Sequence, residues 1–288
     1  MILITGATGG LGNATIDSLL QKGVPANNII ALVRDETKAT NMKQKGIQIR
    51  VGNYNDYHSL KDALSGVDKL LLISSNEMVD RLVQHKNVID AAIENNVAHI
   101  IYTGIDIRSF EDTAIPHVSH IHRDTAAYLD TTVIPYTLLH DNLYADSIPL
   151  FLGDSVLETG IFFPAGDGKT PFVPRTDVGE AAAMVLTTTG HEGKAYAIAA
   201  ETAYSFENIA EMLSEISGKK VKYLRPDLDT YIRTLVDNGV PKDSAMFLGS
   251  FGTAIANGEI DTNHSDLEKL LGRKSTPLKA YLAGIYGN

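Results

Sequence analysis

The chain begins with an apolar run that leads directly into a glycine-rich turn, MILITGATGGLG. Apolar residues continue at helical spacing over 14–20, and a second apolar run follows at 29–33. The segment therefore predicts a strand, a tight turn, a helix and a second strand. Glycines at this spacing let the backbone turn sharply and let its N–H groups approach a phosphate at the start of the helix. A purely structural turn is the alternative, but the flanking pattern favours a dinucleotide site formed by Gly6, Ala7, Thr8, Gly9, Gly10, Leu11 and Gly12.

The composition excludes several other classes of protein. The 288 residues include no cysteine, so disulfides and thiolate chemistry are not available, and the formal charge of -10 argues against a nucleic-acid surface. No apolar stretch approaches the roughly 20 residues that span a membrane, and the first strand starts where a signal peptide would stand. We expect a soluble, cytoplasmic monomer or homodimer with no membrane span and no nucleic-acid partner.

Strand-like and helix-like segments alternate over the first half of the chain. Short apolar runs predict strands at 2–5, 29–33, 47–51, 69–73, 98–103 and 133–139. Helical patterns lie between them at 12–22, 56–65, 79–95 and 119–130. This alternation predicts an α/β fold, with a Rossmann-type, doubly wound parallel sheet that is covered on both faces.

The rhythm changes after Tyr144. Strand and turn features occupy 160–168, a helical pattern 177–189 and a strand pattern 195–199; Ser205 caps a helix that leads to a strand at 221–224 and further helices. No linker separates these segments from the first half. We assign a dinucleotide-binding Rossmann domain to 1–143 plus 177–202, and a smaller, substrate-binding α/β lobe to 144–176 plus 203–288.

The end of the second predicted strand bears on the choice between NADPH and NADH. A carboxylate there usually binds the ribose 2′-hydroxyl of NAD, whereas a cation accommodates the 2′-phosphate of NADP. Arg34 comes first in this chain, followed by Asp35, with Lys38 one turn further on. The planar guanidinium of Arg34 suits a phosphate, which favours NADPH. If Asp35 binds the ribose hydroxyl instead, NADH is possible.

Polar and aromatic residues also follow the other predicted strands. Ligands bind at the carboxyl ends of strands in parallel sheets of this kind, so these positions are expected to contact the adenine, the pyrophosphate or the nicotinamide ribose. We assign them to cofactor binding: Asn53, Tyr54, Ser74, Ser75, Tyr102 and Thr103. Four aromatic residues are candidates for the apolar walls of a pocket for a planar substrate: Tyr102, Tyr144, Phe162 and Phe163. The alternative is that they belong to the core, as aromatic residues near strand ends more often do.

Several motifs in order resemble the NmrA-like group of atypical short-chain dehydrogenases. They are TGATGGLG at 5–12, ALVRD at 31–35, KLLLISS at 69–75, AHIIYTG at 98–104, IPYTLL at 134–139, PAGDGK at 164–169 and GHEGKAY at 190–196. Within that group the chain is similar to the type 2 NAD(P)H:quinone oxidoreductases and the triphenylmethane reductases. The resemblance implies a Rossmann domain with a small C-terminal lobe, NADPH binding and reduction of quinones or similar planar acceptors.

The resemblance also implies site residues. Cofactor contacts are expected from Gly6 to Leu11, from Arg34, from Ser74 to Asn76 and from the segment 141–146, which contains Asp141, Asn142 and Tyr144. Arg175 matches an arginine in the family's second-lobe segment. The positions that we expect to face the acceptor are His140, Tyr144, Phe163 and Arg175.

The chain departs from the short-chain dehydrogenase pattern in its proton donors. Typical members use a Tyr-x-x-x-Lys pair after the fifth strand, but no lysine occurs between Lys86 and Lys169. The match at Tyr57 and Lys61 lies after the third strand and is interpreted as coincidence. Where quinone-type relatives have lysine the chain has Ala127, and where they have Arg-Asn it has His140 followed by Asp141. Loss of the pair favours an electron-poor acceptor, which takes hydride with little acid assistance.

A histidine cluster, His117, His120 and His122, precedes the next predicted helix. A metal site is disfavoured because no cysteine and no second ligand-rich segment accompany it. His122 matches a histidine of the quinone-type relatives and is the candidate for a weak acid near the nicotinamide. Helix capping or packing is the alternative for all three.

The sequence thus favours an NADPH-dependent oxidoreductase that passes hydride to quinones or similar planar aromatic acceptors. Two other functions stay open. An NmrA-like regulator would bind the dinucleotide without turnover and signal to a protein partner. An isomerase or epimerase of nucleotide sugars is disfavoured, because that chemistry usually needs the Tyr-Lys pair.

Overall fold

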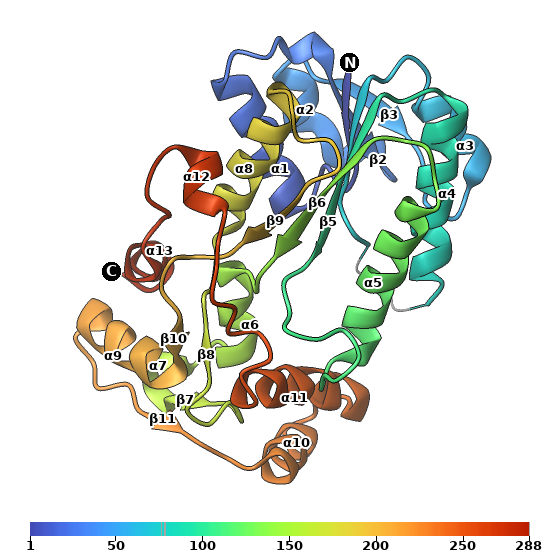
Figure 1. Cartoon of the computed structure of the whole chain (residues 1–288). Helices are drawn as coiled ribbons and strands as arrows, with labels where there is room; N and C mark the ends of the chain where they lie inside the picture. Colours follow the sequence, from blue (N-terminus) through green and yellow to red (C-terminus); the bar gives the residue numbers. More distant parts are fainter. Residues whose placement is uncertain (76, 78, 288) are drawn as a thin grey trace.

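A computed structural model describes residues 1–75, 77 and 79–287. Within these residues the centre of the molecule is a parallel sheet of seven strands (Figure 1), in the spatial order β3, β2, β1, β4, β5, β6, β9. Their bounds are β1 Ile2–Ile4, β2 Ile29–Val33, β3 Gln48–Val51, β4 Lys69–Leu72, β5 His99–Ile105, β6 Tyr136–Asp141 and β9 Ala195–Ile198. The strand order reverses between β1 and β4, and the carboxyl ends of these two strands therefore flank a crevice.

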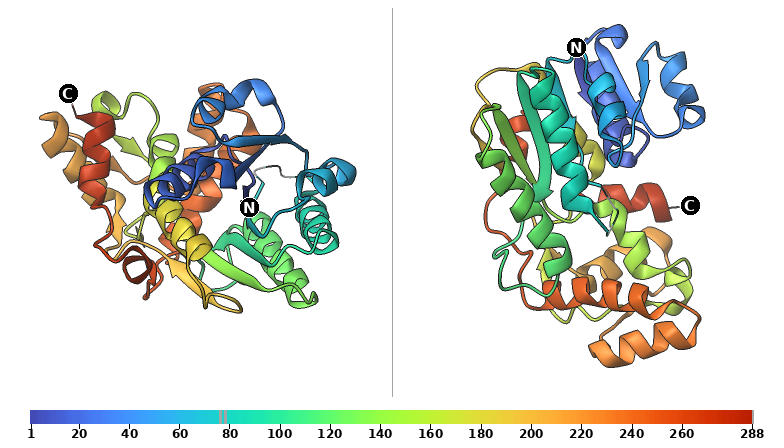
Figure 2. Two further views of the ribbon diagram at one scale, coloured as in Figure 1. Left: turned by 90° about the horizontal axis from the view of Figure 1, so that it is seen from above. Right: turned by 90° about the vertical axis from the view of Figure 1, so that its right-hand side faces the viewer.

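Helices pack on both faces of this sheet (Figure 2). One face packs against α1 (Gly10–Gln21), α2 (Thr40–Gln44), α8 (Arg175–Thr187) and α12 (Leu267–Leu271), and the other against α3 (Tyr57–Ala63), α4 (Arg81–Glu94) and α5 (Pro116–Asp130). Every residue of β2 is buried, as a strand covered on both sides requires. The predicted α/β fold with a doubly wound parallel sheet is confirmed. No helix of the described residues is both long and apolar enough to cross a membrane.

A second apolar core faces the carboxyl ends of the strands (Figure 1). Its elements are α6 Ile148–Leu152, α7 Val156–Thr159, β7 Ile161–Phe162, β8 Lys169–Thr170, β10 Tyr204–Ser205, α9 Phe206–Ser217, β11 Tyr223–Leu224, α10 Leu228–Asp237, α11 Lys242–Ala256 and α13 Leu278–Tyr286. β8 pairs with β10 and β7 with β11, so segments from before and after α8 meet in this lobe. The two lobes are interleaved along the chain, and the domain boundaries stay a prediction.

Element ends show where the sequence patterns were accurate. Ser205 caps α9 as predicted: its Oγ accepts from the backbone N–H of Asn208, whose side chain accepts from the Ser205 N–H. β6 begins at Tyr136 rather than at 133, because the chain is still leaving α5 there and Val133 is 94% exposed. α5 begins at Pro116, three residues earlier than expected, since proline suits the first turn of a helix.

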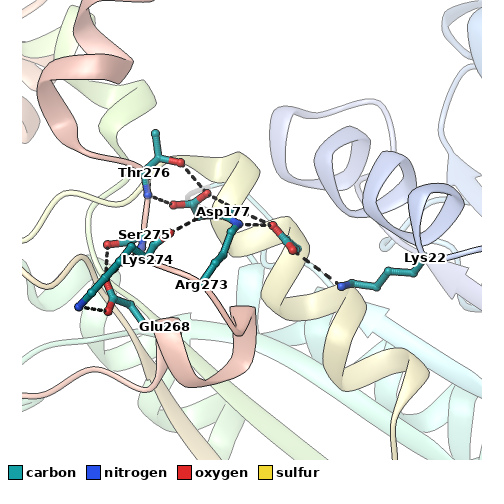
Figure 3. Close-up of polar contacts among 8 residues, drawn as sticks. Lys22, Asp177, Glu268, Arg273, Lys274, Ser275 and Thr276 are labelled. Atoms are coloured by element: carbon teal, nitrogen blue, oxygen red, sulfur yellow. Dashed lines mark hydrogen bonds and ion pairs between the residues drawn. The ribbon is translucent and has the colours of Figure 1, made fainter.

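A buried carboxylate fixes the start of α8 (Figure 3). Asp177 is 1% exposed and accepts three hydrogen bonds, from the Thr276 backbone N–H at 2.6 Å, from the Thr276 hydroxyl at 2.9 Å and from Arg273 Nη2 at 2.8 Å. Arg273 also pairs with Glu180, whose second oxygen lies 3.8 Å from Lys22 Nζ at the end of α1. The segment before α13 is thereby tied to α8 and α1.

We expect Asp177→Ala to lower the free energy of unfolding by about 3 kcal/mol. The substitution leaves a buried backbone N–H and hydroxyl without their acceptor, and it separates Arg273 from one of its two carboxylates. Urea denaturation measures the loss. Glu215→Ala, which removes an exposed partner of Lys279, is the matched control and should cost less than about 1 kcal/mol. Equal losses in the two variants would contradict this account of Asp177.

Candidate active site

The glycine-rich turn has the backbone geometry of a phosphate loop. Gly6 has φ +56°, which favours glycine, and its carbonyl accepts from the Gly9 N–H at 2.9 Å. Gly9 is the N-cap of α1. A Cβ on Gly12 would lie 2.4 Å from the Gly6 carbonyl oxygen and 2.7 Å from Ala7 Cα, so only glycine lets the helix pack this closely on the turn. The first turn of α1 therefore presents its free N–H groups to the crevice.

One cavity of about 830 Å³ runs along the carboxyl ends of the strands. It extends from the loop after β2 and β3, past the glycine turn, to side chains of the second lobe. The predicted cofactor residues that line it are Gly6, Thr8, Gly9, Gly10, Leu11, Gly12, Arg34, Asn53, Tyr54, Ser74, Ser75, Thr103, Asp141, Asn142 and Tyr144. Ala7 is buried beneath the turn, and Asn76 lies outside the described residues. A long, continuous cavity over a helix N-terminus fits an extended dinucleotide.

Arg34 stands at the end of the cavity beside the loops that follow β2 and β3. Its Nη1 donates to Glu77 Oε1 at 2.8 Å, and Gln84 holds the other oxygen of Glu77 at 2.5 Å. The Arg34 side chain is nevertheless 73% exposed and stands at the edge of the cavity, where it can reach a bound anion. Asp35, the rival ligand for a ribose hydroxyl, instead accepts from the backbone N–H and the hydroxyl of Thr37. Lys38 is exposed and does not line the cavity.

Arg175 crosses the glycine turn from the second lobe. Its Cδ lies 3.0 Å from the position that a Cβ on Gly10 would take, so the side chain rests on the first turn of α1. The guanidinium stacks 4.4 Å from the ring centroid of Tyr144, and Asp146 accepts from the Arg175 backbone N–H at 2.9 Å. The sequence placed Arg175 among the acceptor contacts. The structure puts it over the phosphate turn, where a cation complements an anionic ligand.

The ends of β4 and β5 are joined side by side at the middle of the cavity. The Ser74 N–H donates to Thr103 Oγ1 at 3.0 Å, and both residues line the cavity. Tyr102 does not line it, because successive residues of a strand face opposite sides and the Tyr102 ring enters the core between β5 and the helices. The structure therefore places Tyr102 behind the cavity wall, and its contact with a cofactor stays a prediction.

Arg81, which the sequence analysis missed, is a buried cation in the cavity wall. It is 8% exposed, and its Nη2 and Nε donate to Ser74 Oγ at 2.6 and 3.2 Å. Among the described residues no carboxylate pairs with it, and burial lowers its pKa. Arg81 and His85 lie on the buried face of α4, together with Val88 and Ile89. Two polar residues within an apolar helical stripe are the sequence feature that could have identified Arg81 as a buried cation.

His122 lines the cavity but is held as a neutral imidazole. An Arg81 N–H faces its Nε2 at 3.4 Å and can only donate, so Nε2 accepts and Nδ1 carries the proton toward the Tyr102 hydroxyl, 2.8 Å away. Burial, with Arg81 and His85 nearby, depresses the pKa of His122 well below its usual value. A depressed pKa leaves little imidazolium at neutral pH. Arg81 and Tyr102 therefore position this ring, and the expected role as a weak acid loses its physical basis.

The far end of the cavity is apolar and comes mainly from the second lobe. Its lining side chains are Val118, Leu143, Leu150, Phe151, Phe247, Leu248 and Phe251. Phe163 is fully buried beneath them, stacked on Phe151 and Phe206, and does not reach the cavity. His140 faces a separate groove of about 210 Å³, because it alternates with Asp141 along β6. Phe163 and His140 thus lie apart from this cavity, and their contact with an acceptor stays a prediction.

The other two histidines of the cluster lie on the first turns of α5. His117 packs 5.2 Å from the ring of Phe247, and the described residues give no hydrogen-bond partner to Nε2 of His117 or of His120. They are helical residues at the lobe interface rather than part of a loop before the helix. Within the described residues no group of three or more metal-binding side chains is found.

Comparisons with known proteins agree with this geometry. The model of the NmrA-like family matches residues 1–282. Quinone oxidoreductase 2 of Escherichia coli strain K12 is 37% identical over 287 residues, 99% of each chain. A structure of NADPH-dependent quinone oxidoreductase 2 from Escherichia coli, in complex with NADPH, has 35% identity, full coverage of both chains and a TM-score of 0.91.

A second solved structure is equally similar. Triphenylmethane reductase of Citrobacter sp., in complex with NADP(H), is 39% identical, covers 99% of each chain and has a TM-score of 0.91. The isoflavone reductase structure, at 18% identity and a TM-score of 0.73, shares the fold alone. The sequence resemblance is confirmed: the chain belongs to the NmrA-like family.

Proposed function

We propose that the protein is an NADPH-dependent reductase that transfers hydride to quinones or similar planar, electron-poor acceptors. The observation that supports this most is the single cavity, which joins a dinucleotide trough to an apolar, aromatic compartment. Two relatives similar over the whole chain are a quinone oxidoreductase and a triphenylmethane reductase, both with solved complexes of the phosphorylated dinucleotide.

The chain's own residues bind and orient the two reactants. N–H groups at the start of α1 and the guanidinium of Arg175 hold the pyrophosphate, while Arg34 binds the 2′-phosphate. Bound NADPH supplies the hydride. Ser74 and Thr103 line the ribose beside the nicotinamide, and the second-lobe aromatics exclude water from the acceptor and fix its plane.

The residues of the cavity support an electron-poor acceptor. The described residues that line it include no lysine. Tyr57 and Lys61 both pair with Glu94 on the outer side of α3 and α4, so this Tyr-x-x-x-Lys match serves a surface cluster. Without the lysine of a Tyr-Lys pair in this lining, reduction of an unactivated ketone is disfavoured, whereas a quinone or a cationic dye accepts hydride readily.

Anaerobic mixing with NADPH and a set of acceptors tests the proposal. Benzoquinones, naphthoquinones and a cationic triarylmethane dye should cause saturable loss of the reduced-nicotinamide absorbance. Simple ketones and alcohol substrates should cause none. If ketones react and quinones do not, the acceptor class is wrong.

The NmrA-like regulator is the alternative function. The absence of lysine at Ala127 was the sequence feature that permitted it. Ala127 is exposed on α5 and does not line the cavity, which weakens the support that this feature gives to the regulator. A regulator would need only the dinucleotide trough, and the apolar compartment therefore favours the enzyme.

We expect Arg34→Ala to weaken NADPH binding about tenfold and to leave NADH binding nearly unchanged. A hydrogen bond to a charged group contributes roughly 1.5 kcal/mol at the low end, and Glu77 already competes for this guanidinium. Fluorescence titration with each dinucleotide measures the effect. Lys45→Ala, which removes a cation paired with Asp17, should change neither affinity. Equal weakening of both dinucleotides by Arg34→Ala would contradict the 2′-phosphate assignment.

A further inference from the structure

A buried carboxyl group with one unused oxygen lines the middle of the cavity. Asp141 ends β6, opposite Ile105 of β5 and Ile198 of β9, and is 3% exposed. Its Oδ2 accepts from the Tyr144 hydroxyl at 2.6 Å. Its Oδ1 is buried and has no hydrogen-bond partner among the described residues. An unpaired buried carboxyl oxygen is costly, so a ligand in the cavity is the natural partner for it.

The surroundings favour the protonated form of this carboxyl. Burial is the main cause and the nearby Asp106 adds to it, so the pKa of Asp141 is raised to about 8 in spite of the Tyr144 hydrogen bond and Arg175. The remaining titratable neighbour is Tyr102, whose own pKa is raised by burial to about 12. At neutral pH Asp141 therefore carries a proton while Oδ2 still accepts from Tyr144.

No other group of the described cavity wall is placed to give up a proton in this range. The pKa of His122 is depressed, and its Nδ1 proton is engaged by Tyr102. Burial raises the pKa of Tyr144 well above its usual value, so its hydroxyl stays protonated. Arg81 is fixed to Ser74 and keeps its protons. Asp141 is the group whose protonation changes near the working pH.

We propose that Asp141 is the catalytic acid of the reaction, giving its proton through Oδ1 to the reduced acceptor. The inference rests on the proposed function and adds a proton donor to it. The Tyr144 hydroxyl holds the other oxygen and so fixes the orientation of the carboxyl group of Asp141, which lines the cavity. This donor does for a quinone what the missing Tyr-Lys pair does for a ketone in typical short-chain dehydrogenases.

Reduction of a neutral quinone needs a hydride and then a proton. A C–H bond of bound NADPH would break with its electron pair, leaving NADP+, and the new bond to hydrogen would leave the quinone as a hydroquinone monoanion. The Asp141 O–H bond then breaks, its proton goes to the phenolate oxygen, and its electron pair stays on the carboxylate. Water returns a proton to Asp141. In total one NADPH and one proton are consumed for each quinone that is reduced.

A cationic dye provides the internal control, because its hydride adduct is neutral and takes up no proton. At pH 7 Asp141→Asn, a neutral group of the same shape, should lower quinone turnover about tenfold. This expected loss of rate is smaller than the roughly hundredfold contribution typical of a general acid, because hydride transfer to a quinone needs little acid assistance. Dye turnover and NADPH affinity should change less than twofold, and the surface variant Asp243→Asn should change none of these.

The pH profile gives the second measurement. In the parent protein kcat/KM for the quinone should be level below about pH 8 and fall by about tenfold above it, to the level of the Asp141→Asn variant, since the acid must be protonated. The Asp141→Asn variant should lose this descending limb. Infrared spectra without cofactor should show a protonated carboxyl band that disappears with the same midpoint and is absent from the variant.

The outcomes separate the two proposals. If the parent protein passes hydride to no acceptor, the proposed function fails and the acid fails with it. If the parent reduces quinones but Asp141→Asn keeps the rate and the descending limb, only the acid is wrong. Equal loss toward quinone and dye, or a missing infrared transition, would assign Asp141 a structural role and likewise overturn the inference.

Discussion

Gly9→Val should weaken NADPH binding at least a hundredfold, about 2.8 kcal/mol, while the protein stays folded. Gly9 caps α1 at φ -81°, a conformation that valine adopts, and a Cβ there meets only the Gly6 carbonyl oxygen, at 3.2 Å. The branched side chain would instead occupy the space where the pyrophosphate approaches the helix N-terminus. Fluorescence titration with NADPH, beside circular dichroism, measures both effects.

Gly284→Val is the matched control for this variant. A Cβ on Gly284 has open space around it, and Gly284 does not line the cavity, so NADPH affinity should not change. Gly12→Val is not a useful substitute, because its Cβ would collide with the Gly6 and Ala7 backbone and disturb the fold. A folded Gly9→Val protein that binds NADPH normally would show that the dinucleotide lies elsewhere.

Arg175→Ala should weaken NADPH and NADH binding alike, by about thirtyfold, or roughly 2 kcal/mol. The side chain rests on Gly10 at the start of α1, so its charge faces the pyrophosphate, which both dinucleotides contain. This common loss contrasts with the selective loss that we expect at Arg34. Calorimetric titration of the two dinucleotides against each variant gives the comparison.

Arg225→Ala is the control for loss of an arginine from the second lobe. Arg225 pairs with Asp167 and Glu207 at the surface and does not line the cavity, so dinucleotide binding should be unaffected. If Arg175→Ala binds both dinucleotides normally but raises KM for quinones, Arg175 contacts the acceptor, as its place in the sequence first suggested.

The fold could be predicted from local patterns. Unbroken apolar runs such as 29–33 occur in strands that are buried on both faces. The glycine turn and the helical pattern after it predict the order of the first elements, which is strand, helix, strand. The patterns failed where tertiary contacts decide an element's end. Val133 has the side chain of a strand residue, yet it stays exposed because the chain is still turning away from α5.

The candidate site was less predictable than the fold. The sequence indicated which residues lie at the strand ends, but not which side of the sheet each side chain faces. Neighbouring residues of a strand face opposite sides, so Thr103 and Asp141 line the cavity whereas Tyr102 and His140 do not. Arg81 was missed because its interest as a site residue comes from its burial without a partner carboxylate, and burial depends on tertiary structure. An apolar pocket under the second lobe was predicted, but Phe247 and Phe251 were missed, because they are distant in sequence from the sheet and reach the cavity only through the lobe arrangement.

In the proposed reaction one cavity holds NADPH and the acceptor together, and hydride passes between them. The decisive experiment is single-turnover mixing under anaerobic conditions, with NADPH deuterated at the transferred position. We predict oxidation of one NADPH for each quinone reduced, at a rate that saturates with quinone and slows with the deuterated cofactor. Tight NADPH binding with no oxidation by any quinone or cationic dye would contradict the proposed reaction and favour the regulator.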